Sequence, residues 1–214
     1  MKTKSIITSI AIIVAVVLII QFITGQTTDK SASGSSAQQA LSTFKKLVTE
    51  ENYKSYGLKS VGAVKESTLG DAIEIFYIQL DDLKAYQAGQ NTNILKSQHR
   101  VLYPILLSGN AISSAEMENV NGNWEARSFG RGQAVQNYLD DLRKWKADSL
   151  QNTFLVRIPA LALEFYASQV GGKTYMAYTG NQQIANVPPG ELMPMENVLV
   201  NLKQMADAYN GLPW

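Results

Sequence analysis

The feature that most constrains this chain is an uncharged apolar segment near its N-terminus. Residues 5–25 contain no Asp, Glu, Lys, Arg or His, and Lys2 and Lys4 precede them. As a helix rising about 1.5 Å per residue, the segment would reach about 30 Å, which is enough to cross the hydrocarbon core of a bilayer. The sequence therefore predicts a single N-terminal transmembrane helix, with residues 1–25 forming a membrane anchor or signal segment.

Two interpretations of this segment stay open, an uncleaved anchor and a cleaved secretory signal. A signal has an apolar stretch of only about 7–15 residues. This stretch is longer, although residues 24–25 and 31–33 include small side chains that suit a signal peptidase. In both cases Lys2 and Lys4 favour a cytoplasmic N-terminus. We therefore expect a single-pass protein of the cytoplasmic membrane whose C-terminal domain lies outside, in the periplasm or the extracellular space.

Composition excludes several partners and chemistries. The chain of 214 residues has 19 basic and 18 acidic residues, and without Lys2 and Lys4 the exported part has a net charge of −1. Nucleic-acid binding needs clustered positive charge, so we expect no nucleic-acid partner. No run of Lys or Arg is typical of a lipid-binding patch. The chain has no Cys, which excludes disulfides, thiolate metal sites and thiol nucleophiles.

The remainder of the chain divides into a linker and one domain. Residues 26–39 are small and polar, which predicts a flexible tether. Residues 40–214 form the predicted exported globular domain. Within these parts, apolar residues at helical spacing predict a first helix over 36–48, so that the helix begins inside the tether. The best helix pattern covers 133–147, and a last helix is expected over 195–209.

Strands and tight turns dominate the rest of the domain. Residues 72–80 and 154–158 are rich in β-branched and aromatic residues. Asn121-Gly122 predicts a hairpin between 112–120 and 124–129, and Gly171-Gly172 predicts a second hairpin. Pro104 lacks a backbone N–H, so the strand at 100–107 is expected at a sheet edge or beside a bulge. The predicted fold is α+β, with antiparallel sheets built from hairpins and helices packed on one face.

Candidate catalytic and metal-binding residues are few. His99 is the only histidine and begins a predicted strand without a nearby nucleophile motif, so we interpret it as a surface residue. Zinc needs three or four His, Cys or carboxylate ligands. The acidic pairs Asp81-Asp82 and Asp140-Asp141 lack the alternation of a calcium loop and are interpreted as solvent-facing helix residues. We therefore predict no catalytic, cofactor-binding or metal-binding residue and no cofactor.

Three glutamates keep a hydrolytic alternative open. Glu74, Glu125 and Glu164 fall on predicted strands, and a pair of carboxylates at the right separation can hydrolyse a glycosidic bond. Strand glutamates that alternate with apolar residues usually face water, which is the simpler interpretation. The turn Gly130-Arg131-Gly132 precedes a helix and matches neither a P-loop nor a dinucleotide fingerprint, so it is interpreted as helix punctuation. Numerous aromatic residues are compatible with a recognition surface but are also typical of a core.

The sequence thus predicts an exported, membrane-anchored domain, most simply a non-enzymatic interaction or ligand-binding module of the bacterial cell envelope. Its expected partners are the membrane, through residues 5–25, and an envelope protein or a small ligand. The alternative is a carboxylate-dependent hydrolase that acts on cell-surface glycans. A small-ligand site would be expected as a deep, apolar pocket with a few polar groups.

Overall fold

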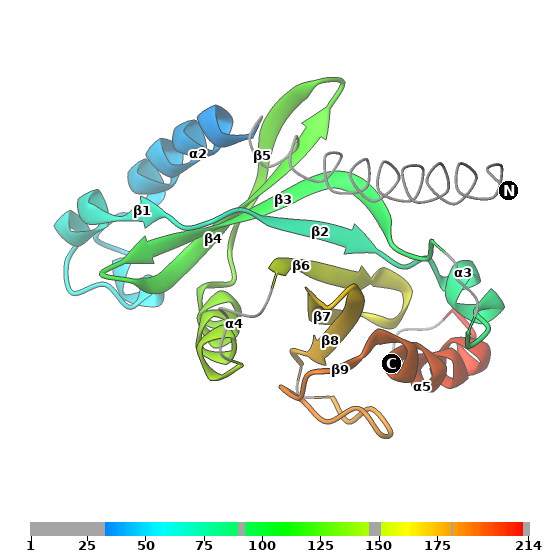
Figure 1. Cartoon of the computed structure of the whole chain (residues 1–214). Helices are drawn as coiled ribbons and strands as arrows, with labels where there is room; N and C mark the ends of the chain where they lie inside the picture. The colour runs from blue at the N-terminus through cyan, green and yellow to red at the C-terminus, as the bar shows by residue number, and fades with distance from the viewer. Residues whose placement is uncertain (1–32, 90–92, 146–150, 181, 212–214) are drawn as a thin grey trace, which may run out of the picture.

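A computed structural model of the chain describes residues 33–89, 93–145, 151–180 and 182–211, without the side chains of residues 151 and 152. The predicted transmembrane segment, residues 5–25, lies outside these ranges. Among the described residues, no helix is both long and apolar enough to cross a membrane. The described part has an α+β fold built on one mostly antiparallel sheet (Figure 1).

The sheet has nine strands in the order β5-β4-β3-β2-β6-β7-β8-β9, and β1 pairs with β3 beside β2. Its strands are β1 (Thr68–Leu69), β2 (Ile73–Tyr77), β3 (Lys96–Leu107), β4 (Asn110–Val120), β5 (Asn123–Gly130), β6 (Gln151–Ile158), β7 (Leu163–Val170), β8 (Lys173–Tyr178) and β9 (Met193–Pro194). Two antiparallel meanders, β3-β4-β5 and β6-β7-β8, therefore flank the central strand β2.

Four α-helices and three short 3-10 helices pack around this sheet in the described part of the chain. They are α2 (Gly34–Leu47), α3 (Leu80–Ala85), α4 (Gly132–Lys144), α5 (Met195–Ala208), η1 (Tyr53–Tyr56), η2 (Val61–Glu66) and η4 (Pro159–Leu161). Figure 1 shows α2 at one end of the sheet and α3 beside α5 at the other end.

Side-chain alternation gives the sheet two distinct faces, which we name by adjacent residues of β2. The Phe76 face includes Phe76, Val101, Met117, Val156 and Phe165. The Tyr77 face includes Ile75, Tyr77, Leu102, Leu155 and Tyr166. Residues that pair across neighbouring strands point to the same face, so the pairs Ile75–Leu155 and Phe76–Val156 continue the two faces from β2 to β6.

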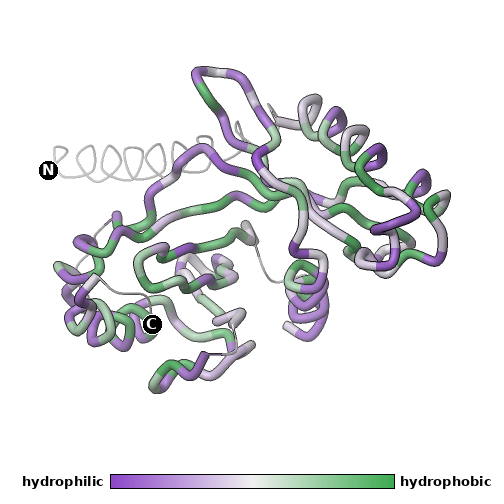
Figure 2. The backbone as a smooth tube through the Cα atoms, turned by 180° about the vertical axis from the view of Figure 1, so that it is seen from behind, coloured by the Kyte–Doolittle hydropathy of each residue, from purple (hydrophilic) through white to green (hydrophobic). Residues whose placement is uncertain are grey.

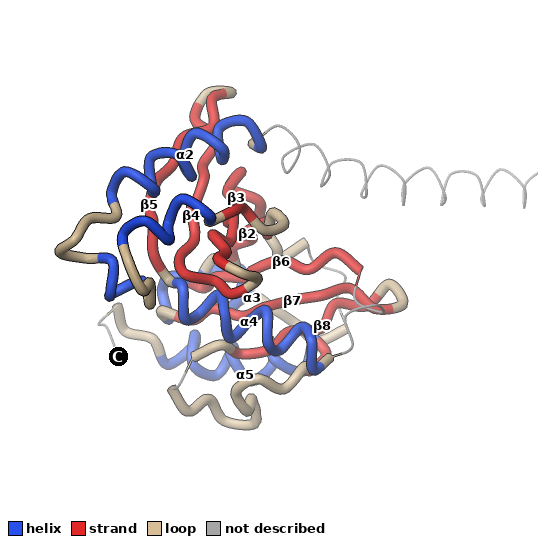
Figure 3. Tube along the Cα trace, turned by 90° about the vertical axis from the view of Figure 1, so that its left-hand side faces the viewer, coloured by secondary structure: helices blue, strands red, loops and turns tan. Residues whose placement is uncertain are grey.

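The helices cover both faces, which corrects the prediction that they pack on one. On the Phe76 face, α2 covers the β3-β4-β5 meander (Figure 3), while α3 and α5 cover the β6-β7-β8 meander. On the Tyr77 face, α4 buries Val135 and Tyr138 against the centre of the sheet. Hairpin signals place strands side by side but do not say on which face a connecting helix returns, so the sequence does not reveal that α4 lies opposite the other helices.

The local predictions for helices and hairpins are confirmed. Asn121 and Gly122 adopt positive φ angles of 53° and 89° and join β4 to β5, as a two-residue hairpin turn requires. This hairpin projects from the sheet and is largely hydrophilic (Figure 2). The expected helices over 36–48, 133–147 and 195–209 correspond to α2, α4 and α5, although residues 146 and 147 lie outside the described part.

Pro104 lies in an interior strand, so of the two predicted positions, a sheet edge or a bulge, the edge does not apply. β3 pairs with β4 on one side and with β1 and β2 on the other. The Pro104 carbonyl accepts a hydrogen bond from Gly70 N at 2.8 Å, in the short gap between β1 and β2. Because no ladder donor is needed in this gap, proline is tolerated there. The predicted bulge is present one residue further on, between Ile105 and Leu106.

Two other features depart from the sequence prediction. β2 pairs with β6 in parallel, although only antiparallel pairing was expected. The predicted tether of residues 26–39 is too long at its C-terminal end, because residues 34–39 belong to α2 and Ala37 is fully buried. Ser33, the first residue that the structure describes, also has a buried side chain.

Candidate functional site

A chain of alternating charges crosses the part of the Tyr77 face that none of the described α-helices covers. This ion-pair chain runs in the order Arg127, Glu118, Arg100, Glu116, Arg157, Glu164 and Arg131. Its members come from β3, β4, β5, β6, β7 and the residue before α4. Strand register aligns Arg100 with Glu118 and Arg157 with Glu164 as cross-strand neighbours.

The centre of the ion-pair chain is largely buried. Glu116 accepts hydrogen bonds from Arg100 Nη1 at 3.2 Å and from Arg157 Nη1 at 3.0 Å, and so bridges two strands that β2 separates. The Tyr77 hydroxyl lies 3.4 Å from the same two guanidinium nitrogens. Side-chain exposure is only 10% for Glu116 and 18% for Arg157. Buried charges of this kind are stable only when they are paired.

Glu164 sits between two arginines at one end of the chain. Its Oε2 atom accepts hydrogen bonds from Arg157 Nε and Arg131 Nη1, each at 2.8 Å, and Arg131 Nη2 bonds to Oε1. Burial alone raises the pKa of Glu164, but the bonds to Arg131 and Arg157 more than offset it, so its pKa lies below the ordinary value. A carboxyl group held ionised in this way is unsuited to act as a general acid.

The three candidate glutamates for glycoside hydrolysis do not form one site. Glu74 lies on β2 between Ile73 and Ile75, so it points to the Phe76 face, whereas Glu164 points to the Tyr77 face. Glu125 lies on β5, is 52% exposed and pairs loosely with Arg127 at 3.4 Å. Glu164 was expected to face water, but it is mostly buried. This burial depends on Arg131 and Arg157, which no local pattern around Glu164 reveals.

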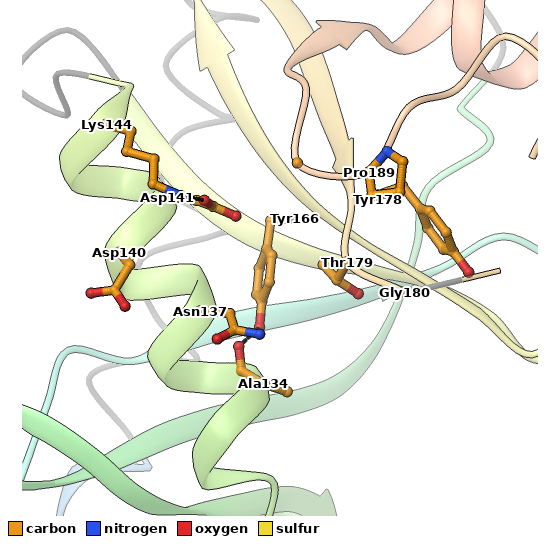
Figure 4. A pocket seen from close by; sticks show the side chains of 11 residues that line it. Ala134, Asn137, Asp140, Asp141, Lys144, Tyr166, Tyr178, Thr179, Gly180 and Pro189 are labelled. Carbon is orange, nitrogen blue, oxygen red and sulfur yellow. Dashed lines mark hydrogen bonds and ion pairs between the residues drawn. The ribbon is translucent and has the colours of Figure 1, made fainter. Parts of the chain in front are cut away.

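A cavity of about 300 Å³ lies beside α4, next to the start of β7 and the end of β8 (Figure 4). Residues 134, 137, 141 and 144 recur at helical spacing and form one wall along α4. The opposite wall comes from the end of β8 and residues 189 and 190. The cavity is open and mainly polar, so it differs from the deep apolar pocket that the sequence analysis described for a small ligand.

Charged and aromatic side chains shape this cavity. Asp141 and Lys144 reach over it from α4, and Lys144 Nζ donates to Asp141 Oδ1 at 2.9 Å. Tyr166 forms the floor, where its hydroxyl donates to the Ala134 carbonyl at 3.0 Å. Asp140 lies at the rim and its carboxylate points away from Tyr178 (Figure 4). The pair Asp140-Asp141 thus lies on a helix, as predicted, but Asp141 is half-buried at a cavity.

Packing beneath the cavity is tight and aromatic. Tyr166 stacks on Tyr138 of α4 with ring centroids 3.9 Å apart. Burial raises the pKa of Tyr138 to about 12, and burial together with the nearby Glu164 charge raises that of Tyr166. Both phenols are therefore neutral across the physiological range. Tyr166 and Thr179 connect the cavity to the ion-pair chain, because Tyr166 lies two positions along β7 from Glu164 and the Thr179 hydroxyl donates to the Glu164 carbonyl at 3.0 Å.

Gly132, which follows Arg131, serves packing. A Cβ atom on Gly132 would lie 2.5 Å from the Ile112 carbonyl oxygen, so glycine is needed where α4 approaches β4. Arg131 itself has a positive φ of 61° and directs its guanidinium to Glu164. The interpretation of this turn as helix punctuation agrees with this geometry.

The remaining candidates do not gather into a further site. His99 is exposed at an irregularity where β3 meets β2, with its backbone N–H 3.2 Å from Ser97 Oγ. Asp81 and Asp82 lie in the first turn of α3. The aromatic residues divide among three apolar clusters, so they form no single recognition patch. Among the described residues, no group of three His, Asp or Glu side chains is placed to hold a metal ion.

Comparison of the chain with protein-family models, curated proteins and solved structures finds no match. The class of protein therefore rests on the geometry described above and on the N-terminal segment. Sequence reasoning missed most of the ion-pair chain and the cavity residues Asn137, Tyr178 and Thr179. The only available signal was the alternation of Glu and Arg with apolar residues on several strands, which does not say which strands are neighbours.

Proposed function

We propose that this chain is a non-enzymatic binding module of the bacterial cell envelope, anchored in the cytoplasmic membrane by residues 5–25. The uncharged segment and the preceding Lys2 and Lys4 support a cytoplasmic N-terminus and an exported domain, periplasmic or extracellular. The proposed partner is a small polar ligand that occupies the cavity beside α4.

The observation that carries this proposal is the cavity wall formed by Asp141, Lys144 and Tyr166. A cavity of about 300 Å³ is at the lower limit for small-ligand sites. Lys144 engages Asp141 Oδ1, while Oδ2 lies 3.9 Å from the position that a Cβ atom on Gly190 would occupy. Because Gly190 has no side chain, the space beside this carboxylate oxygen stays open.

The charges of the cavity favour one class of ligand. Asp140 pairs with Arg143 and turns its carboxylate away from Tyr178, so the charged atom that a ligand meets beside Gly190 is Asp141 Oδ2. An anionic ligand is therefore disfavoured, while a neutral polyol or a cationic amine finds carboxylate, amide and hydroxyl partners at Asp141, Asn137 and Thr179. Tyr166 and Tyr178 supply aromatic surface for the apolar side of such a molecule.

Three hexose derivatives of similar size test this assignment. Binding of glucosamine, glucose and gluconate to the full chain in detergent would be compared by saturation-transfer NMR. We expect glucosamine to bind best and gluconate worst, and Asp141→Asn to remove the preference for the amine. Asp207→Asn, on the exposed side of α5, is the matched control and should leave the order unchanged. Absence of binding by all three, or a preference for gluconate, would contradict the proposal.

The alternative of a glycan hydrolase gains no support from a described feature. Glu74 and Glu164 point to opposite faces of the sheet, and Arg131 and Arg157 keep Glu164 ionised. A retaining or inverting mechanism needs two carboxyl groups across one cleft, one of them with a raised pKa. The binding module is therefore the function that the geometry supports best.

A further inference from the structure

The first buried residue that the structure describes is close in the sequence to the proposed membrane anchor. Ser33 is buried, and its hydroxyl lies 2.7 Å from the Tyr103 hydroxyl on β3. Only seven residues, 26–32, separate Ser33 from the end of the uncharged segment at Gly25. Even a fully extended chain of seven residues spans no more than about 25 Å. The surface around the start of α2 is therefore held near the lipid headgroups.

The α2 layer, which we define as residues 33–66, has the opposite charge to the rest of the domain. It contains five lysines against three glutamates, a net charge of +2. Residues 67–214 contain eleven basic and fourteen acidic residues, a net charge of −3. The lysines are spread along the sequence at positions 45, 46, 54, 59 and 65, so no run of basic residues marks them.

The fold turns the polar side of this layer outward. Ala37, Leu41 and Phe44 are buried against β3, β4 and β5. At 100° per residue, Lys46 lies on the opposite side of α2. Lys45 Nζ donates to the Lys65 carbonyl at 2.9 Å, which joins the outer surfaces of α2 and η2.

Leu47 adds an apolar group to this basic surface. It is 50% exposed, and Val200 on α5 is the other large hydrophobic side chain described as exposed. α2 and α5 cover different ends of the sheet. A leucine among lysines suits the boundary between lipid headgroups and acyl chains.

We propose that the α2 layer is the membrane-facing surface of the domain and that anionic lipid headgroups are its partner. This inference rests on the proposed anchor, and it adds the orientation of the domain on the bilayer. The short tether brings the layer within reach, its positive charge attracts anionic lipid, and the negative remainder of the domain is repelled. Each lysine near such a surface contributes on the order of a fivefold change in partition.

Labelling at two single cysteines tests the orientation directly, because the chain has no native Cys. The full chain with Leu47→Cys or Val200→Cys would carry a fluorophore in nanodiscs of phosphatidylcholine with phosphatidylglycerol. Lipids with a nitroxide on the headgroup quench only nearby labels. We expect stronger quenching at the Leu47→Cys site than at the Val200→Cys site.

Charge reversal supplies the second readout. Adding Lys46→Glu and Lys59→Glu to the Leu47→Cys chain should reduce quenching in the anionic discs, and discs of phosphatidylcholine alone should show a smaller difference between the two sites. Equal quenching at both sites, or stronger quenching at the Val200→Cys site, overturns the orientation and leaves the anchor in place. Failure of the chain to enter the discs overturns the anchor and with it this inference.

Discussion

The two faces of the sheet are stabilised by different means. On the Phe76 face, helices cover both meanders and two apolar clusters fill the space between. On the Tyr77 face, α4 covers only the centre, and the ion-pair chain occupies the part without a helix. Both faces of the sheet therefore carry buried side chains. On the part of the Tyr77 face that no described helix covers, these side chains are charged and paired instead of apolar. The cavity lies beside α4, at the border of this partly covered face.

The largest loss of stability is expected for a substitution on the Phe76 face. Phe44 is fully buried and contacts Tyr56 and Phe129 at ring centroid distances of 5.2 and 5.7 Å. Phe44→Ala should lower the free energy of unfolding by about 3–5 kcal/mol, because it removes a large side chain and leaves a cavity. Urea unfolding followed by tryptophan fluorescence measures this loss. A loss as small as that of the control Val200→Ala would contradict the described packing.

A smaller loss of stability is expected at Glu164, in the buried part of the ion-pair chain. Glu164→Gln leaves Arg131 and Arg157 without their shared carboxylate and should lower the free energy of unfolding by about 2–4 kcal/mol. The same urea titration measures it. A loss below about 0.5 kcal/mol is typical of exposed ion pairs. Such a loss would show that water solvates the ion-pair chain and that the contrast between the two faces is wrong.

Acid should weaken the Tyr77 face selectively. The pKa of Glu164 and that of Glu118 are lowered from 4.5 by their arginine partners. The stabilisation from a lowered carboxyl pKa is complete above the unfolded-state value and is lost as the pH falls through the folded-state value. The free energy of unfolding should therefore be constant at pH 6–7 and fall progressively below about pH 4.5. Urea midpoints measured across this range should fall less steeply in Glu164→Gln, and identical slopes would contradict the assignment.

The smallest loss of stability is expected at Glu125, which pairs with Arg127 at the exposed end of the ion-pair chain. Glu125 is 52% exposed and lies 3.4 Å from Arg127, which is itself 43% exposed. Glu125→Gln should change the free energy of unfolding by less than about 0.5 kcal/mol. The difference between the losses in Glu125→Gln and Glu164→Gln shows whether burial determines how much an ion pair contributes to the free energy of unfolding. Equal losses in the two variants would show that it does not.

Much of the fold could be predicted because its signals are local. The turn residues Asn121-Gly122 and Gly171-Gly172, and the apolar spacing in α2, α4 and α5, depend on neighbours only a few residues away. The parallel pairing of β2 with β6 joins residues about 80 positions apart, and no local pattern contains that information. The same limit explains why the sequence does not reveal that α4 lies opposite the other helices, or that the strand of Pro104 is interior.

The candidate site was harder to predict for the same reason. The sequence correctly identified Glu164 as a strand residue, but its burial depends on Arg157 across one strand pair and on Arg131 at the start of α4. The cavity joins α4 to residues 178–180 and 189–190, which become neighbours only when the sheet is complete. Charge and residue type were visible in the sequence, whereas the pairing of charges was not.

The proposed position of the described domain, outside the cytoplasmic membrane, can be tested by one labelling measurement. Val200→Cys provides a single exposed thiol in the full chain. We predict that a membrane-impermeant maleimide labels this thiol in intact cells as completely as after lysis, and that the labelled chain sediments with membranes. Labelling that occurs only after lysis would place the domain in the cytoplasm and contradict the account.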